Sequence, residues 1–205
     1  MNHILAMPAF AISFILGIVL NKILIPILKK FNFGQNIREE GPESHLKKSG
    51  TPTMGGVAII ISMIIGTVAF IWTDINNLVV IISTLLFGAI GCVDDMLKIV
   101  HHQSEGLKAW QKLGLQFIVA LAMTLYFALG TSGGTGTLIP FIGMVDLHGW
   151  FYILSMFAIL GTVNGANFTD GLDGLAGSVT TVIAGFFAIT AITLSSGISI
   201  SSLAM

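Results

Sequence analysis

The stretch NLVVIISTLLFGAIGCVDDMLKIV, residues 77–100, begins as an apolar run and ends with two adjacent aspartates and a lysine. Its apolar part, residues 77–93, has the composition of a membrane helix, because a bilayer core requires about 20 mostly apolar residues per span. Asp94 and Asp95 stand where this run ends, and Lys98 follows them. Ionisable residues at membrane depth are costly and often functional. The stretch therefore predicts a membrane helix with a candidate functional site at its polar end.

The rest of the chain repeats this apolar pattern. Of its 205 residues, 54% are hydrophobic and only 9% are charged, whereas an ordinary soluble domain has roughly 25% charged residues. We expect an all-α fold, a polytopic transmembrane helix bundle, forming a single integral membrane domain over residues 1–205. The formal net charge of −1 argues against nucleic acid as a partner. The six predicted spans are about 4–28, 54–73, 77–93, 113–130, 150–166 and 178–196.

The basic residues predict the orientation of these spans. They lie towards the end of the first span, in the loop around 30–52 and in the loop around 94–112, whereas connections 74–76 and 131–149 contain none. Because cytoplasmic loops carry the excess of Lys and Arg, both basic loops are expected inside and the N-terminus outside. Because successive spans cross the membrane in opposite directions, the loop 165–177 is then also expected on the cytoplasmic side. The glycine-rich 131–149 connection is expected to form a turn or small hairpin on the outer face.

The acid pair at the end of the third span has two interpretations. If the helix continues, Asp94 and Lys98 share a face at i,i+4, while Asp95 points about 100° away. Two carboxylates this close repel one another, and a proton, a cation or a bound metal relieves the repulsion. Oxygen ligands of this kind suit Mg²⁺, which commonly takes one or two carboxylates plus substrate phosphates. The alternative is a solvated helix end where Lys98 merely neutralises one acid.

A second polar stretch, NFTDGLDGLAG, spans residues 167–177. Asn167, Asp170 and Asp173 recur every three residues, so they could line one side of a helical turn. Glycines between them let the backbone bend or let a ligand approach it. Carboxylate acceptors beside exposed backbone amides could recognise a nucleobase. The alternative is ordinary turn chemistry with an N-cap, because Asp and Gly are common where a helix begins.

A third polar stretch, GPESHLKKSGTPTMGG, spans residues 41–56. Lys47 and Lys48 offer cationic donors, and Thr51 and Thr53 offer hydroxyls, just before a predicted span. Basic side chains beside helix-start amides make a reasonable phosphate site. The alternative is a polybasic loop that touches anionic headgroups. The G-x-x-x-x-G-K-[ST] loop of nucleotide hydrolases is absent from this sequence.

Together, KKSGTPTMGG, VDDMLK and NFTDGLDGLAG, in that order, closely resemble the phospho-N-acetylmuramoyl-pentapeptide transferase family, also called translocase I. The resemblance implies transfer of phospho-N-acetylmuramoyl-pentapeptide from its UDP carrier to undecaprenyl phosphate, giving lipid I and UMP in peptidoglycan synthesis. It also implies Mg²⁺ as cofactor, UDP-N-acetylmuramoyl-pentapeptide and undecaprenyl phosphate as substrates, and a multi-pass protein of the bacterial inner (plasma) membrane with a cytoplasmic active site. The family further suggests a homodimer.

The resemblance assigns roles residue by residue. Asp94 and Asp95 match the catalytic acid pair and tentative metal ligands, and Lys98 and Lys112 match the charged surroundings of the phosphates. One Asp of the pair would orient or deprotonate the lipid phosphate, or would form a covalent aspartyl-phosphate. Lys48 and Thr53 match family positions near the uridine end of the substrate-binding cleft. The nucleoside-binding segment is matched by Asn167, Asp170, Gly171, Leu172 and Asp173, with Asp173 the expected uracil partner.

The sequence also departs from the family pattern. Family members typically have about ten membrane helices, a further metal-binding aspartate in a Gly-Asp-x-Gly-Ser motif and a late histidine cluster. Neither motif occurs within these 205 residues. We therefore expect an N-terminal fragment of a longer enzyme, with a further metal ligand beyond residue 205. The 205 residues alone are expected not to catalyse transfer.

Two alternative functions remain open from the sequence. The chain could instead be another polyprenyl-phosphate amino-sugar-1-phosphate transferase, although the segment GPESH…TPTMGG argues against this. It could also be a membrane transporter module with acids lining a pathway, but that function predicts charges near the middle of spans. Here the charges gather at span ends and in loops, which favours an enzyme supplied from one side of the membrane.

Overall fold

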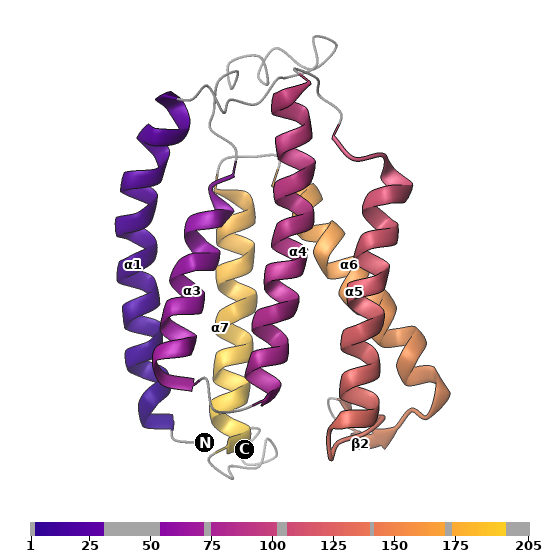
Figure 1. Cartoon of the computed structure of the whole chain (residues 1–205). Helices are drawn as coiled ribbons and strands as arrows, with labels where there is room; N and C mark the ends of the chain where they lie inside the picture. Colours follow the sequence, from indigo (N-terminus) through magenta and orange to yellow (C-terminus); the bar gives the residue numbers. More distant parts are fainter. Residues whose placement is uncertain are drawn as a thin grey trace. The chain divides into compact units, whose positions relative to one another are not determined.

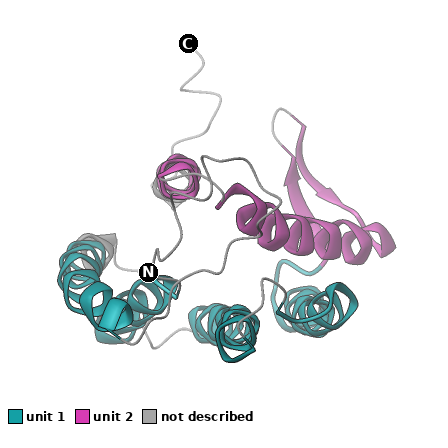
Figure 2. Cartoon of the chain, turned by 90° about the horizontal axis from the view of Figure 1, so that it is seen from above, with its two compact units in different colours: residues 1–134 teal, residues 135–205 magenta. Residues whose placement is uncertain are grey.

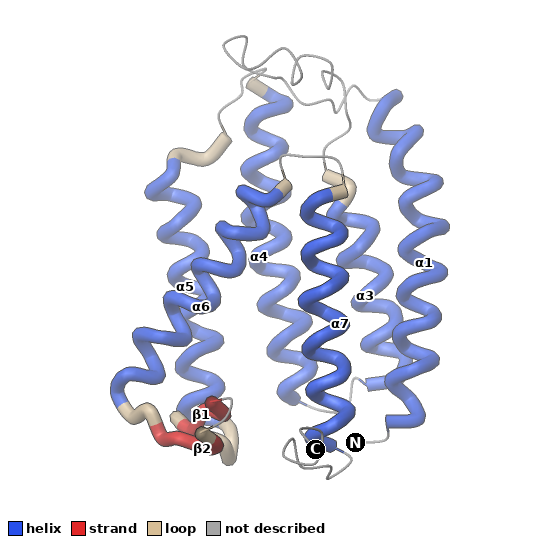
Figure 3. Tube along the Cα trace, turned by 180° about the vertical axis from the view of Figure 1, so that it is seen from behind, coloured by secondary structure: helices blue, strands red, loops and turns tan. Residues whose placement is uncertain are grey.

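The computed structural model describes residues 3–30, 54–71, 75–101, 106–139, 142–170 and 174–195. The chain divides into two compact units, residues 1–134 and residues 135–205 (Figure 2). The single-domain assignment stays a prediction. The elements, in chain order, are α1 (His3–Lys30), α3 (Gly56–Ile71), α4 (Ile75–Val100), α5 (Ala109–Gly130), β1 (Gly136–Ile139), β2 (Gly143–Asp146), α6 (Gly149–Thr169) and α7 (Leu175–Ser195) (Figures 1 and 3).

All six predicted spans are helices, which confirms an all-α polytopic membrane fold. Among the described residues, four helices are long and apolar enough to cross a membrane: α1, α4, α5 and α6. The apolar parts of α3 and α7 are shorter, Gly56–Ala69 and Leu175–Thr190. Large apolar side chains point outward along every helix, as Phe14, Ile118 and Phe186 do. That distribution is typical of a protein whose surrounding solvent is lipid.

Small side chains let α1 and α3 pack closely within the first unit, where the two helices lie side by side (Figure 1). Ala9 and Ala58 are buried, and Ser62 faces the backbone of Gly17. A Cβ placed on Gly66 would overlap the hydroxyl of Ser13 and lie 2.9 Å from the carbonyl oxygen of Ala9. Membrane helices associate through such small residues because lipid gives no hydrophobic drive for helix pairing.

We expect Gly66→Ala to lower the free energy of unfolding by about 1–3 kcal/mol, because the added methyl group meets the backbone of α1 and forces the helices apart. The matched control is Gly91→Ala in α4, where a Cβ would meet no atom within 4 Å. Reversible unfolding of the full-length protein in mixed micelles measures both variants. Equal stability of the two variants would contradict the close contact at Gly66.

The glycine-rich 131–149 connection forms the small hairpin that was one of its two predicted forms. β1 pairs antiparallel with β2, from Gly136 opposite Asp146 to Ile139 opposite Gly143. At its open end Asp146 accepts hydrogen bonds from the hydroxyl of Thr135 and from the backbone N–H of His148. These bonds, with the imidazole of His148 nearby, lower the pKa of Asp146 to about 2. The hairpin therefore ends in a carboxylate that is ionised at neutral pH and joins β2 to the start of α6.

Candidate active site

α4 does not end where its apolar run ends. The helix continues to Val100, so Asp94, Asp95 and Lys98 all lie on its last two turns. The conditional prediction of a continuing helix is thus confirmed. The lysine in the last turn interacts favourably with the negative end of the helix dipole. The pair of carboxylates is consequently held on a regular helix and not on a loop.

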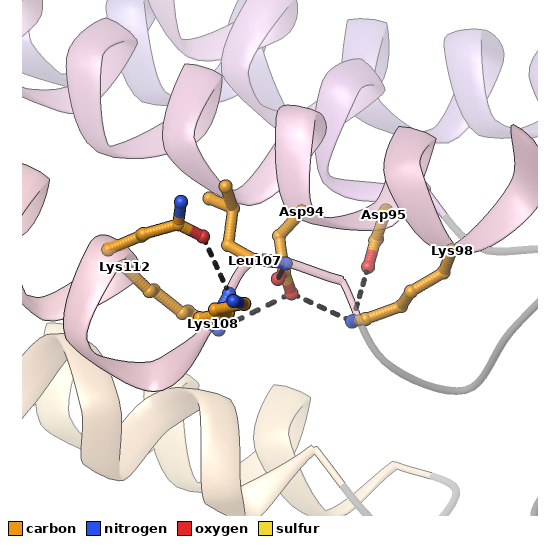
Figure 4. Close-up of polar contacts among 7 residues, drawn as sticks. Asp94, Asp95, Lys98, Leu107, Lys108 and Lys112 are labelled. Carbon is orange, nitrogen blue, oxygen red and sulfur yellow. Dashed lines mark hydrogen bonds and ion pairs between the residues drawn. The ribbon is translucent and has the colours of Figure 1, made fainter. Parts of the chain in front are cut away.

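Asp94 is the centre of the contacts at this end of α4 (Figure 4). Only 5% of the surface of Asp94 is exposed. The Nζ of Lys98 lies 2.7 Å from Asp94 Oδ2, and the Nζ of Lys112 lies 3.5 Å from the same oxygen. The backbone N–H of Leu107 donates to Asp94 Oδ1 over 2.8 Å. A buried carboxylate is tolerated because paired charges and hydrogen bonds replace its lost hydration.

Asp95 occupies the more accessible side of the same cluster. Lys98 Nζ also lies 3.1 Å from Asp95 Oδ1, so one ammonium group bridges both acids. The Asp95 side chain keeps 32% of its surface exposed, against 7% for that of Asp94. Two carboxylates and two ammonium groups give this acid–lysine cluster (Asp94, Asp95, Lys98 and Lys112) a formal charge of zero. The lysines of the cluster thus relieve the repulsion between its two carboxylates. An incoming anion can contact the same lysines.

The start of α5 supplies the other half of the cluster. Lys112 lies in the first turn of that helix, and Lys108 is its N-cap residue, whose backbone N–H donates to Gln111 Oε1 over 3.0 Å. The positive end of the α5 dipole lies near Asp94, an arrangement that favours negative charge. The sequence does not predict the contact from Leu107, since a backbone donor has no residue-type signature. The only sequence signal nearby is the glycine at position 106.

The donor chemistry of the acid pair fits Mg²⁺, which prefers carboxylate oxygens. Asp95 is the more accessible ligand, and both oxygens of Asp94 already face hydrogen-bond or ion-pair partners. Within the described part of the chain, no group of three or more His, Cys, Asp or Glu side chains could hold a metal ion. Asp94 and Asp95 as ligands of Mg²⁺ stay a prediction from the sequence.

The remaining predicted site residues divide into two groups. Asn167 lies in the last turn of α6, and Asp170 follows as its C-cap residue; both are exposed. Asp170 lies in a turn at the end of α6, so nucleoside binding and ordinary turn chemistry both stay predictions for this stretch. Gly174, with φ of +79°, occupies a backbone conformation that favours glycine just before α7. The predicted residues outside the described ranges are Lys48, Thr53, Gly171, Leu172 and Asp173.

Comparison with known proteins gives two matches to family models. Residues 77–205, which include the acid–lysine cluster, match the model of glycosyl transferase family 4. Residues 48–60 match signature 1 of phospho-N-acetylmuramoyl-pentapeptide-transferase, within the third polar stretch and the start of α3. The two matches together contain every residue to which the resemblance assigns a role in the site.

Curated relatives carry the same name as that signature. The phospho-N-acetylmuramoyl-pentapeptide-transferase of Clostridium novyi (strain NT) is 46% identical over 180 residues, covering 87% of this chain and 55% of the relative. The protein of that name from Desulforamulus reducens is 42% identical over 201 residues, covering 94% of this chain and 60% of the relative. The chain thus spans a little over half the length of these relatives.

Proposed function

The chain belongs to glycosyl transferase family 4, and we propose that it carries part of the active site of a phospho-N-acetylmuramoyl-pentapeptide transferase. The reaction moves phospho-N-acetylmuramoyl-pentapeptide from its UDP carrier to undecaprenyl phosphate. Its products are lipid I, a precursor of peptidoglycan, and UMP. The protein works in the bacterial inner membrane, with the acid–lysine cluster on the cytoplasmic face, where the predicted orientation places basic loops.

The observation that carries this proposal is the acid–lysine cluster at the polar end of a membrane helix. Lys98 and Lys112 converge on one oxygen of the buried Asp94, from the end of α4 and the start of α5. Transfer of a phosphoryl group is mostly positioning and neutralisation of charge, so lysines of this kind suit a diphosphate. Trp110, an exposed residue in the first turn of α5, fits the aromatic belt at a membrane–water interface.

Each member of the cluster has a distinct role. An oxygen of the lipid phosphate attacks the phosphorus attached to the sugar, and the bond from that phosphorus to the UMP oxygen breaks. Asp94 orients the attacking phosphate or takes its proton, while Lys98 and Lys112 neutralise the diphosphate. In the covalent alternative, an Asp carboxylate attacks first and the lipid phosphate then displaces it. Mg²⁺, held by Asp95 together with Asp94, would supply further charge neutralisation at the diphosphate.

The uridine end of the substrate is assigned to the other two polar stretches. Lys48 and Thr53 fall within the residues that match the transferase signature. Asn167 and Asp170, at the end of α6, present exposed polar groups, as nucleoside binding requires. The remaining assigned residues are Gly171, Leu172 and Asp173.

The test of this function is a transfer assay with the full-length protein in liposomes that contain undecaprenyl phosphate. UDP-N-acetylmuramoyl-pentapeptide should yield equal amounts of UMP and lipid-linked product, and excess UDP-N-acetylglucosamine should not compete. Effective competition would instead indicate a transferase for another amino sugar. Uptake of a solute into the liposomes with no lipid product would indicate a transporter and would refute the proposal.

A further inference from the structure

The hydrogen bond from Leu107 differs in kind from the other contacts to Asp94. Lys98 and Lys112 reach the carboxylate through long side chains with several rotatable bonds, so they can move towards a substrate phosphate. The Leu107 N–H belongs to the backbone just before α5 and joins two segments 13 residues apart in the chain. A donor fixed to the backbone cannot rotate away. It therefore holds Oδ1 in place while Oδ2 faces the lysines.

Gly106 is the residue that permits this contact. A Cβ at position 106 would overlap both the carbonyl oxygen and Oδ1 of Asp94, and would lie 2.9 Å from Asp94 Cγ. The carbonyl oxygen is part of helix α4, so no change of side-chain rotamer relieves the overlap. By contrast, a Cβ on Gly114 in α5 would meet no atom within 4 Å. Position 106 thus requires glycine, because a side chain there would overlap Asp94.

We propose that Gly106 and the Leu107 N–H form a positioning element for Asp94. The element fixes the plane of the carboxylate, so that one oxygen stays hydrogen-bonded and the other faces the lysines and the incoming phosphate. This inference rests on the proposed function, in which Asp94 acts on the lipid phosphate. Fixed orientation matters there because a misplacement of about 1 Å can cost roughly a hundredfold in rate. Gly106 and Leu107 act through Asp94 and are not themselves catalytic.

The experiment compares Gly106→Ala with the matched control Gly114→Ala in the full-length protein. Hydrogen exchange at the Leu107 amide is the first measurement, and it does not depend on activity. In Gly106→Ala this exchange should be roughly tenfold faster or more, because a hydrogen bond to a charged acceptor is lost. Transfer kinetics are the second measurement: kcat should fall by about a hundredfold, with KM for the UDP substrate within about twofold of the parent value.

The outcomes separate this inference from the proposed function. Unchanged Leu107 exchange in Gly106→Ala, or an equal loss of kcat in Gly114→Ala, would overturn the positioning role. If the parent protein has no transferase activity, the proposed function fails, and faster exchange still supports the contact itself. If Gly106→Ala does not fold, Asp94→Asn replaces it, because the weaker neutral acceptor should also speed Leu107 exchange. Unchanged exchange in that variant would overturn the inference.

Discussion

Asp94→Asn in the full-length protein is expected to lower kcat for transfer by roughly 10²–10⁴-fold, the range of a lost general base. Asn keeps the shape of Asp and one acceptor oxygen, so Leu107 still has a partner. It loses the negative charge that Lys98 and Lys112 contact at 2.7 and 3.5 Å. It also cannot take a proton from the lipid phosphate or attack phosphorus. The substitution therefore removes the group on which either route through Asp94 depends.

The matched control for this experiment is Asp146→Asn in the hairpin. Asp146 is also hydrogen-bonded to a backbone N–H and paired with a basic side chain, but it lies on β2 and outside the acid–lysine cluster. Its variant should keep transfer close to the parent rate. Amounts of inserted protein are compared in both variants before rates are measured. Near-normal turnover of inserted Asp94→Asn would remove Asp94 from the mechanism.

Lys98→Gln is expected to lower kcat/KM by roughly 10²–10³-fold, as loss of one preorganised donor at a developing charge does. Lys98 contacts both carboxylates, so its removal leaves the pair with less neutralisation and removes a cation from the diphosphate site. Lys108→Gln is the control, because Lys108 is an exposed lysine at the start of α5. Steady-state kinetics measure both variants. Equal effects of the two substitutions would show that general positive charge, and not the bridge, matters.

Much of the fold could be predicted from the sequence because membrane helices have a strong local signal. All six predicted spans are helices; the apolar run of the third ends at residue 93, and the polar motif after it extends the helix. The backbone hydrogen bonds of α4 continue to Val100 regardless of side-chain polarity. The pairing of Asp94 with Lys98 followed from helical spacing alone. Helical periodicity in the sequence is therefore sufficient to predict a contact wherever both residues lie on the same helix.

The contacts that complete the site could not be predicted in the same way. Lys112 and Leu107 reach Asp94 from α5 and the residues before it, and only the packing of α4 against α5 brings them there. The close contact of Gly66 with α1 likewise depends on how two helices meet. A glycine that permits a close approach looks, in the sequence, like a glycine that simply bends the chain. Tertiary packing thus determines which polar residues share a site.

The central claim is that the lysines of the acid–lysine cluster bind the diphosphate of the UDP substrate. Amine labelling of the unmodified full-length protein, followed by peptide mass spectrometry, tests this directly. With UDP-N-acetylmuramoyl-pentapeptide at about ten times its Kd, labelling of Lys98 and Lys112 should fall by about tenfold, in proportion to occupancy. Labelling of Lys108, one turn away from Lys112, should stay unchanged. Equal labelling of Lys98 and Lys112 with and without bound substrate would contradict the account.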